Sequence, residues 1–252
     1  MTTEPSQHSD GEDRSVLARE QAHPSFTLTY GSHPEHVAEV FQPTTPARGW
    51  AIGIHGGFWR PAYDRVHLRN TAAALAEHGV VSILIEYRRI PGQPRTTVDD
   101  ICLAVSALSA DPDLQPTSTS TPMLWGHSAG GHLALVAALR LPATLRGVVA
   151  LAPVTDLVLA EQENLGRGAV TEFLGGSAQD YADIDPARQV RPGLPITLIH
   201  GMRDSLVPYT QSQRLTELWS EIECTALPDT GHFEPIDPQS SIWATVAAKI
   251  TN

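Results

Sequence analysis

Short apolar runs alternate with longer amphipathic stretches from residue 26 onward. Several of the runs are almost continuous in Val, Ile and Leu, which is typical of strands covered on both faces. Eight runs predict strands: FTLTY 26–30, HVAEVF 36–41, WAIGIH 50–55, VVSILIEY 80–87, PMLWG 122–126, GVVALA 147–152, ITLIH 196–200 and ECTAL 223–227.

Helical periodicity fills most of the intervals between these runs. It predicts helices over 66–79, 97–110, 131–141, 209–221 and 238–250. Thr97 is the expected N-cap of the second helix. The alternation predicts an α/β fold with about eight strands in a mostly parallel sheet and helices on both faces. No helix fits between the first two runs, so they are expected to pair antiparallel.

Two segments depart from this alternation. Residues 1–23 are polar, acidic and almost free of large apolar side chains, which predicts a flexible tail ahead of a single domain over 24–252. Residues 154–192 contain short helical pieces among many helix breakers. A long irregular segment inside a compact domain is usually functional, so we expect a lid or cap that covers a binding pocket.

One pentapeptide, Gly126-His127-Ser128-Ala129-Gly130, lies between a predicted strand and a predicted helix. A sharp turn at this point brings the two glycines too close together for Cβ atoms and holds the serine in a strained conformation. The pattern predicts a nucleophilic serine, Ser128. The competing interpretation is a glycine-rich turn without chemistry.

A serine hydroxyl becomes a strong nucleophile only when a base removes its proton and an acid orients the base. On such a sheet the acid and the base follow late strands, in the order Ser, Asp or Glu, His. Asp204 follows the seventh predicted strand and His232 follows the eighth. Two alternatives for the acid remain: Asp156, which follows the sixth predicted strand, and Asp229, which lies shortly before His232 but on the wrong side of the end of the last strand.

The loop after the third predicted strand reads IHGGFW, over residues 54–59. Backbone N–H groups of such a loop stabilise the negative oxygen of an acyl-transfer intermediate. The expected N–H donors are Gly57 and Phe58 of this loop, with Gly56 as an alternative, and Ala129, the residue after Ser128. These groups are the predicted oxyanion hole.

Side chains next to these motifs are candidates for the walls of a substrate pocket. Trp59 and Tyr63 suit an aromatic or apolar group, although Trp59 also suits packing beneath the loop. His127 flanks the serine and is expected to shape the pocket. Further along, Arg88 is expected to pair with Asp99 or Asp100 and to hold the loop after the fourth predicted strand.

The composition limits the classes of partner. The chain has 252 residues and a formal net charge of −11, which argues against nucleic acid and anionic membranes as partners. It contains no long apolar span, no leader pattern, and two cysteines without metal-type spacing, which together predict a cytoplasmic protein. No metal or other cofactor is expected.

The motifs HGGFW, GHSAGGH, HGMRD and GHFE occur in this order. With them the chain resembles the α/β-hydrolases, and within these the HGG-type esterases and the kynurenine formamidase (arylformamidase) group. The resemblance covers about residues 26–250 and implies a triad of Ser128, Asp204 and His232. It also implies a small ester or formamide substrate, no cofactor, and a monomer or homodimer. Phe58 stands where many lipases have a third glycine.

Other function classes remain as alternatives. A hydrolase-like binding protein without catalysis would need no complete triad, and a small peptidase or amidase would use the same groups. A dinucleotide-binding oxidoreductase is disfavoured because no G-x-G-x-x-G follows the first strand. A dehalogenase would need an aspartate in place of Ser128.

Overall fold

The computed structural model describes residues 11–114 and 121–252. Within these residues eight strands form one sheet in the order β1-β2-β4-β3-β5-β6-β7-β8. β2 runs antiparallel to both of its neighbours, and the remaining pairs are parallel. Both sequence predictions, the mostly parallel sheet and the antiparallel entry, are confirmed. The strands are β1 Phe26–Thr29, β2 Val37–Phe41, β3 Gly49–Ile54, β4 Val80–Ile85, β5 Met123–His127, β6 Gly147–Leu151, β7 Ile196–Gly201 and β8 Glu223–Leu227.

The predicted helices are present in the described part of the chain. The α-helices are α1 Ser15–Ala18, α2 Arg69–Glu77, α3 Pro94–Ala110, α4 Ala129–Arg140, α5 Leu157–Gln162, α6 Ala169–Leu174, α7 Thr210–Leu218 and α8 Trp243–Thr251. The short 3₁₀ turns are η1 Arg65–Leu68, η2 Pro142–Thr144, η3 Ala178–Asp180, η4 Ala182–Ile184, η5 Pro186–Arg188 and η6 Glu234–Ile236.

The start of α3 differs from the expectation. The helix begins at Pro94, three residues before Thr97, because proline carries a φ suited to the first helical position. The Thr97 hydroxyl donates to the carbonyl oxygen of Arg88 at 2.7 Å instead of capping the helix. Arg88 in turn donates to both carboxylate oxygens of Asp100, which is one of the two partners predicted for it.

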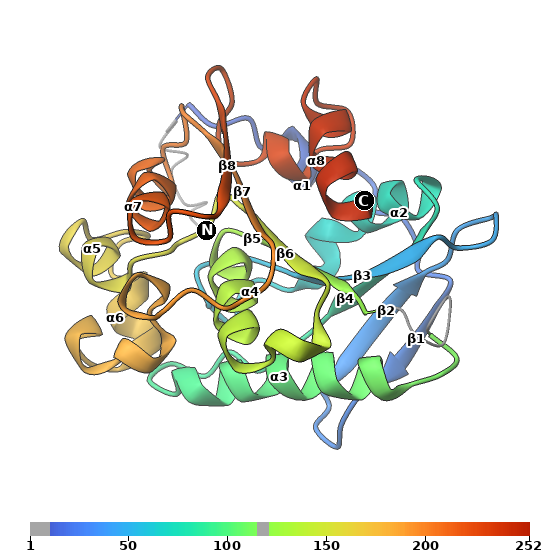
Figure 1. Ribbon diagram of the computed structural model, residues 1–252, viewed down its shortest axis with the longest axis horizontal. Coiled ribbons are helices and arrows are strands. Elements are labelled where there is room, and N and C mark those ends of the chain that lie inside the picture. The colour runs from blue at the N-terminus through green and yellow to red at the C-terminus, as the bar shows by residue number, and fades with distance from the viewer. Residues whose placement is uncertain (1–10, 115–120) are drawn as a thin grey trace, which may run out of the picture.

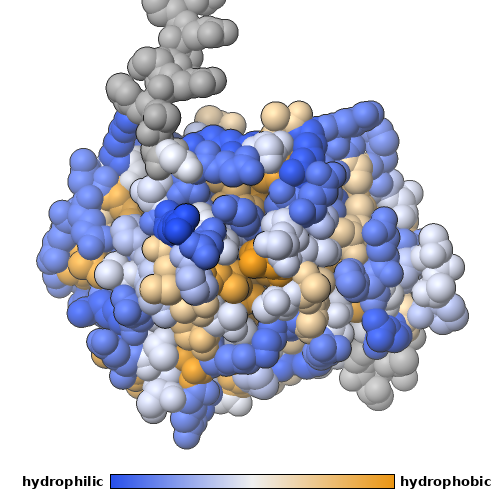
Figure 2. Space-filling view, turned by 90° about the horizontal axis from the view of Figure 1, so that it is seen from above, coloured by the Kyte–Doolittle hydropathy of each residue, from blue (hydrophilic) through white to orange (hydrophobic). Residues whose placement is uncertain are grey.

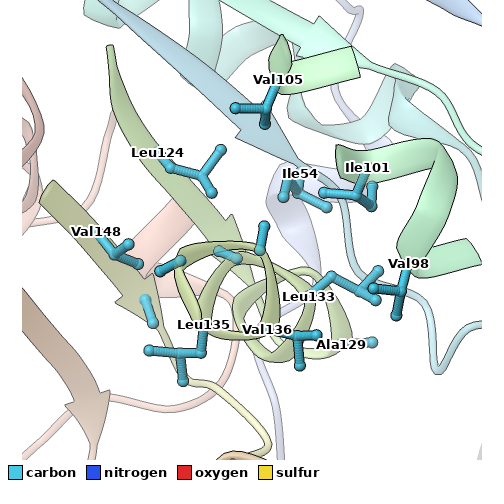
Figure 3. Close-up of a cluster of buried hydrophobic side chains, with 14 of the residues drawn as sticks. Ile54, Val98, Ile101, Val105, Leu124, Ala129, Leu133, Leu135, Val136 and Val148 are labelled. Carbon is cyan, nitrogen blue, oxygen red and sulfur yellow. The ribbon is translucent and has the colours of Figure 1, made fainter. Parts of the chain in front are cut away.

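Helices cover both faces of the sheet (Figure 1). α3 and α4 pack on one face, and α1, α2 and α8 pack on the other, so that each face buries its own apolar cluster. In Figure 3, Leu133 of α4 lies beside Val98 of α3, and Leu124 and Val148 extend from the strands toward the same cluster. Burial of these apolar side chains is the main force that holds the layers together.

The exterior is correspondingly polar. On the face shown in Figure 2, hydrophilic residues surround a small hydrophobic area near the centre. In the described part of the chain no helix is both long enough and apolar enough to cross a bilayer. Cys102 and Cys224 are both free thiols.

Part of the N-terminal segment, predicted as a flexible tail, lies against the domain in the structure. Residues 1–10 lie outside the described residues, but residues 11–23 contain α1 and pack on the domain. Val16 is buried in the cluster beneath α8, and Arg19 forms an ion pair with Asp237. In the structure residues 11–23 therefore contact the domain through one apolar anchor and through polar partners, and the flexibility of the tail stays a prediction.

Candidate active site

Ser128 lies at the turn between β5 and α4, and its backbone φ is +58°. This value is costly for a residue with a side chain and is maintained by the surrounding packing. A Cβ on Gly126 would come within 2.2 Å of the Gly130 carbonyl oxygen, and a Cβ on Gly130 within 2.1 Å of the Ile54 carbonyl oxygen. Backbone carbonyl oxygens therefore leave no room for a Cβ at either position, so both must be glycine, as the pentapeptide predicts.

Asp204 and His232 are brought together from the loops after β7 and β8. His232 Nδ1 donates to Asp204 Oδ2 at 2.6 Å. The other carboxylate oxygen of Asp204 accepts the backbone N–H groups of Leu206 at 2.9 Å and Val207 at 2.7 Å. These bonds fix the carboxylate and leave the opposite ring nitrogen of His232, Nε2, as the atom available for chemistry.

The protonation state of Asp204 follows from its neighbours. Burial alone would raise its pKa. The charge of His232 and hydrogen bonds from His200 and His232 outweigh burial and hold the pKa of Asp204 below its usual range. Asp204 is therefore ionised throughout the neutral range and suited to orient His232.

The two alternative acids are engaged elsewhere. Asp156 caps α5, where its side chain accepts the N–H of Leu159 at 2.8 Å, and it also pairs with Arg214. Asp229 pairs with Arg203 at 2.5 Å, and both of these side chains are largely exposed. The geometry therefore leaves Asp204 as the partner of the histidine.

His127 supports His232 from below. Its Nε2 donates to the backbone carbonyl oxygen of His232 at 2.9 Å, and the two rings lie 4.5 Å apart. Burial, reinforced by the charge of His232, lowers the pKa of His127 well below its usual value. His127 is therefore neutral and acts as a fixed hydrogen-bond donor.

The loop after β3 has an unusual backbone. Gly57, Phe58 and Trp59 have φ values of +105°, +54° and +56°. A Cβ on Gly56 would lie 2.7 Å from the His127 carbonyl oxygen, so this loop packs directly on the Ser128 turn. No described residue accepts a hydrogen bond from the N–H of Phe58 or from the N–H of Ala129. Such N–H groups are available to a developing oxyanion.

A buried charged network holds this loop. Glu86, directly after β4, accepts from His55 Nε2 at 2.9 Å and from the Arg65 guanidinium at 3.1 Å, and it also pairs with Arg89. These contacts, led by the hydrogen bond and charge of His55, overcome burial and keep the pKa of Glu86 below its usual range. Tyr87 donates to the His55 carbonyl oxygen at 2.7 Å. The residue that begins the HGG motif is therefore fixed at both its ring and its backbone.

The serine and histidine open onto one cavity of about 330 Å³. Most of its lining is apolar or aromatic, and only narrow parts of Ser128 and His232, 3% and 2% of their surfaces, are exposed. The lining residues are Arg14, Leu17, Gly57, Phe58, Tyr63, His67, His127, Ser128, Leu206, His232 and Phe233. Tyr63 and His127 thus line the cavity, as expected.

Trp59 does not line this cavity, contrary to its expectation as a pocket residue. Its ring stacks on Phe173 of α6 at 4.7 Å and meets His132 of α4 edge-on at 5.3 Å. The left-handed backbone at Trp59 turns the side chain under the loop, which is the packing alternative that its sequence left open. Its surface is 3% exposed.

The segment 154–192, predicted as a lid or cap, lies away from the lining of this cavity. None of its residues lines the cavity. Instead it contacts the residue that follows the HGGFW loop after β3: Arg60 donates to the Gly166 carbonyl oxygen at 2.9 Å and pairs with Glu172. From outside the predicted motifs, Arg14 and Leu17 of the N-terminal segment line the cavity, and the lid role of residues 154–192 stays a prediction.

Several residues of the site were missed by sequence reasoning. Glu86 falls within the fourth predicted strand, 80–87, and its position at the end of a parallel strand is the signal that marks it. His200, at the end of β7, lies 3.3 Å from Asp204, and Glu12 contacts the backbone of His232. Nothing local in the sequence marks Glu12. In the described ranges no group of three or more His, Cys, Asp or Glu side chains is placed to hold a metal ion.

Comparisons with known proteins agree with this architecture. A family model described as BD-FAE matches residues 41–218. Esterase LipC of Mycobacterium tuberculosis is 26% identical over an alignment of 243 residues, gaps included, that covers 83% of this chain. The chain spans 60% of the length of that relative.

Solved structures give the same fold. A putative thioesterase from Silicibacter sp. has a TM-score of 0.71 and 26% identity, with 90% of this chain and 84% of that chain covered. Esterase B from Lactobacillus rhamnosis has a TM-score of 0.75 and 20% identity, with 94% and 87% covered. The sheet, its helical layers and these neighbours show an α/β-hydrolase fold, and the matched residues show that the chain belongs to the BD-FAE family.

Proposed function

We propose that the protein is a serine hydrolase that cleaves small carboxylic esters through an acyl-enzyme. One observation carries this proposal. Asp204 and His232 form a 2.6 Å hydrogen bond, and His232 opens onto the same cavity as Ser128, whose backbone is held at a positive φ. A merely structural turn has no need of this combination.

In the first half-reaction His232 Nε2 takes the proton of Ser128, and Oγ attacks the ester carbonyl carbon. The carbonyl π electrons move to the oxygen, which becomes negative. When the tetrahedral intermediate collapses, the C–O bond to the alcohol breaks and His232 gives its proton to the leaving alkoxide. Water, deprotonated by His232, then attacks the carbonyl carbon of the acyl-enzyme. The bond between this carbon and Ser128 Oγ breaks, His232 returns its proton to Oγ, and the acid is released.

The oxyanion is stabilised by the N–H groups of Gly57 or Phe58 and of Ala129. Each such donor contributes about 3 kcal/mol to the transition state in serine hydrolases. Ala129 is the first residue of α4, so the helix dipole acts in the same direction. Asp204 stabilises the imidazolium that exists only while the proton is on His232.

The cavity supports a small substrate. A volume of about 330 Å³ is near the lower end for ligand sites, and Phe58, Tyr63 and Phe233 offer aromatic contacts. Relatives named as esterases support an ester as the substrate class. The aromatic lining also favours a second candidate, an aryl formamide, in which a formyl group occupies the acyl side and the arylamine leaves.

The test is a comparison of initial rates on p-nitrophenyl acetate and N-formylkynurenine. Ser128→Ala is the diagnostic variant, and Ser106→Ala, an exposed position on α3, is the matched control. We expect ester turnover that Ser128→Ala abolishes and Ser106→Ala retains. Formamide turnover far above ester turnover would select the second candidate. Turnover that survives in Ser128→Ala, or no turnover in the wild type, would refute the proposal.

A further inference from the structure

We infer that the N-terminal segment Glu12–Arg19 is a strap that completes the active site. It holds the two loops that carry Asp204 and His232 at a fixed separation, and it forms one wall of the substrate cavity. Glu12 is the positioning residue, and Leu17 limits the size of the bound group. This inference rests on the proposed function and concerns the same site.

Glu12 joins the two loops directly. Its Oε1 accepts the backbone N–H of Ser205 at 2.6 Å and the Ser205 hydroxyl at 2.7 Å. Its Oε2 accepts the backbone N–H of His232 at 2.6 Å. Ser205 follows Asp204, so one carboxylate binds the backbone next to the acid and the backbone of the base itself.

The histidine loop is shaped to admit this carboxylate. A Cβ on Gly231 would lie 2.3 Å from Glu12 Oε2, so a side chain at that position would push Glu12 away. The Gly231 N–H is separately bound to Glu234 Oε1 at 3.1 Å. The N–H of His232 is thus bound by Glu12, whereas the N–H of the preceding residue, Gly231, is bound by Glu234.

The other end of the strap is anchored on the body of the domain. Val16 is 1% exposed and belongs to the same apolar cluster as Ile236. Arg19 Nη2 donates to Asp237 Oδ2 at 2.7 Å, and a second bond joins the same two groups. With Glu12 at one end and Arg19 at the other, the residues between them are held across the mouth of the site.

Those intermediate residues form part of the cavity wall. Arg14 and Leu17 line it together with Ser128 and His232. The Arg14 guanidinium lies 5.3 Å from the ring centroid of Phe233, which is also a lining residue. The segment 154–192 contributes nothing to this lining, so the strap takes the place that a lid would occupy on this side.

The positioning role has a kinetic consequence. Asp204 and His232 come from different loops, so their relative placement depends on the contacts between those loops. The backbone N–H groups of Ser205 and His232 donate charge-assisted hydrogen bonds to the same Glu12 carboxylate. These bonds restrict the relative placement of the two loops in the ground state and in the transition state. Misplacement of a catalytic group by about 1 Å costs up to about 10²-fold in rate. The effect falls on kcat, since Glu12 itself does not line the cavity.

Glu12→Gln is the primary variant. An amide keeps the size of the side chain but offers one acceptor oxygen, so its NH₂ group opposes either the N–H of Ser205 or that of His232. Glu20→Gln is the control, since it makes the same charge change at an exposed position in the same region. The measurements are kcat and KM on p-nitrophenyl acetate, the fraction of active sites titrated by a serine-directed phosphonate, and the melting temperature.

We expect Glu12→Gln to lower kcat per titrated site by about 10-fold or more, with KM within about twofold, and Glu20→Gln to match the wild type. A purely structural role would lower the melting temperature or the titrated fraction and leave kcat per site unchanged, and this result would overturn the positioning role. If the wild type shows no Ser128-dependent turnover, the proposed function and this inference fail together. If the wild type shows that turnover and Glu12→Gln keeps its kcat per titrated site, only the positioning role fails.

Leu17→Ala tests the wall independently of the loops. Replacement of the isobutyl side chain by a methyl group enlarges the cavity, so the ratio of kcat/KM for p-nitrophenyl octanoate to that for the acetate should rise by about 5-fold or more, which corresponds to roughly 1 kcal/mol. A ratio equal to the wild-type ratio would show that bound substrate does not reach this wall and would overturn that part of the inference.

Discussion

His132 provides a test of the packing behind the candidate site. It lies in α4, is fully buried, and meets the ring of Trp59 edge-on. Its Nε2 donates to the Ile184 carbonyl oxygen at 2.8 Å and thereby ties α4 to the segment 154–192. Burial lowers its pKa to about 4, although the bond to Ile184 opposes this shift. The folded protein therefore holds His132 neutral.

The size of the effect follows from linkage. The ordinary pKa of histidine is 6.5. Between pH 6.5 and 4 the unfolded chain binds a proton on His132 that the folded chain does not, so stability falls as pH falls through this window. For these two pKa values the loss between pH 7.5 and pH 5 is about 2 kcal/mol of unfolding free energy.

The perturbation is His132→Gln, which retains a donor for Ile184 and removes the titration. Urea unfolding at pH 7.5 and pH 5 gives the free energy of unfolding for each protein. The wild type should lose about 2 kcal/mol more than His132→Gln between the two pH values. His23→Gln, at an exposed position, is the control and should follow the wild type. If His132→Gln loses as much stability as the wild type, the histidine is not held neutral and the reasoning fails.

Three further outcomes are expected. Gly126→Ala should destabilise the protein by about 3 kcal/mol, measured by thermal unfolding, because its Cβ would meet a carbonyl oxygen of the first turn of α4 at 2.2 Å. Asp204→Asn should lower kcat about 10⁴-fold, and Asp229→Asn should change it less than about twofold; equal losses in the two variants would contradict the assignment of the acid. Glu86→Gln should lower the urea unfolding free energy by about 3 kcal/mol, because it leaves the buried Arg89 cation without its carboxylate.

The sequence predicted the parts of the site that depend on neighbouring residues. The turn at Ser128 needs glycines two positions before and after it, and this spacing is visible in the chain itself. The loops that carry Asp204 and His232 were located because each follows a recognisable strand. Among the three candidate acids, however, the distance to His232 made the choice, and that distance depends on the paths of two loops.

The direction in which a side chain points could not be predicted from the sequence as well. Trp59 and Phe58 are adjacent in the sequence and both suit a pocket wall. In the structure both have a positive φ, Phe58 lines the cavity and Trp59 stacks on Phe173, and no sequence pattern specifies this division.

The sequence by itself determined the alternation of strands and helices, the mostly parallel sheet and the positions of the candidate catalytic motifs, because these follow from local periodicity and from steric limits at single turns. Only the tertiary structure decided that the polar N-terminal segment, and not residues 154–192, lines the cavity. Glu12 is separated from His232 by 220 positions. A contact between residues so far apart in the sequence depends on the path of the whole chain, so it cannot be predicted from the composition of either segment.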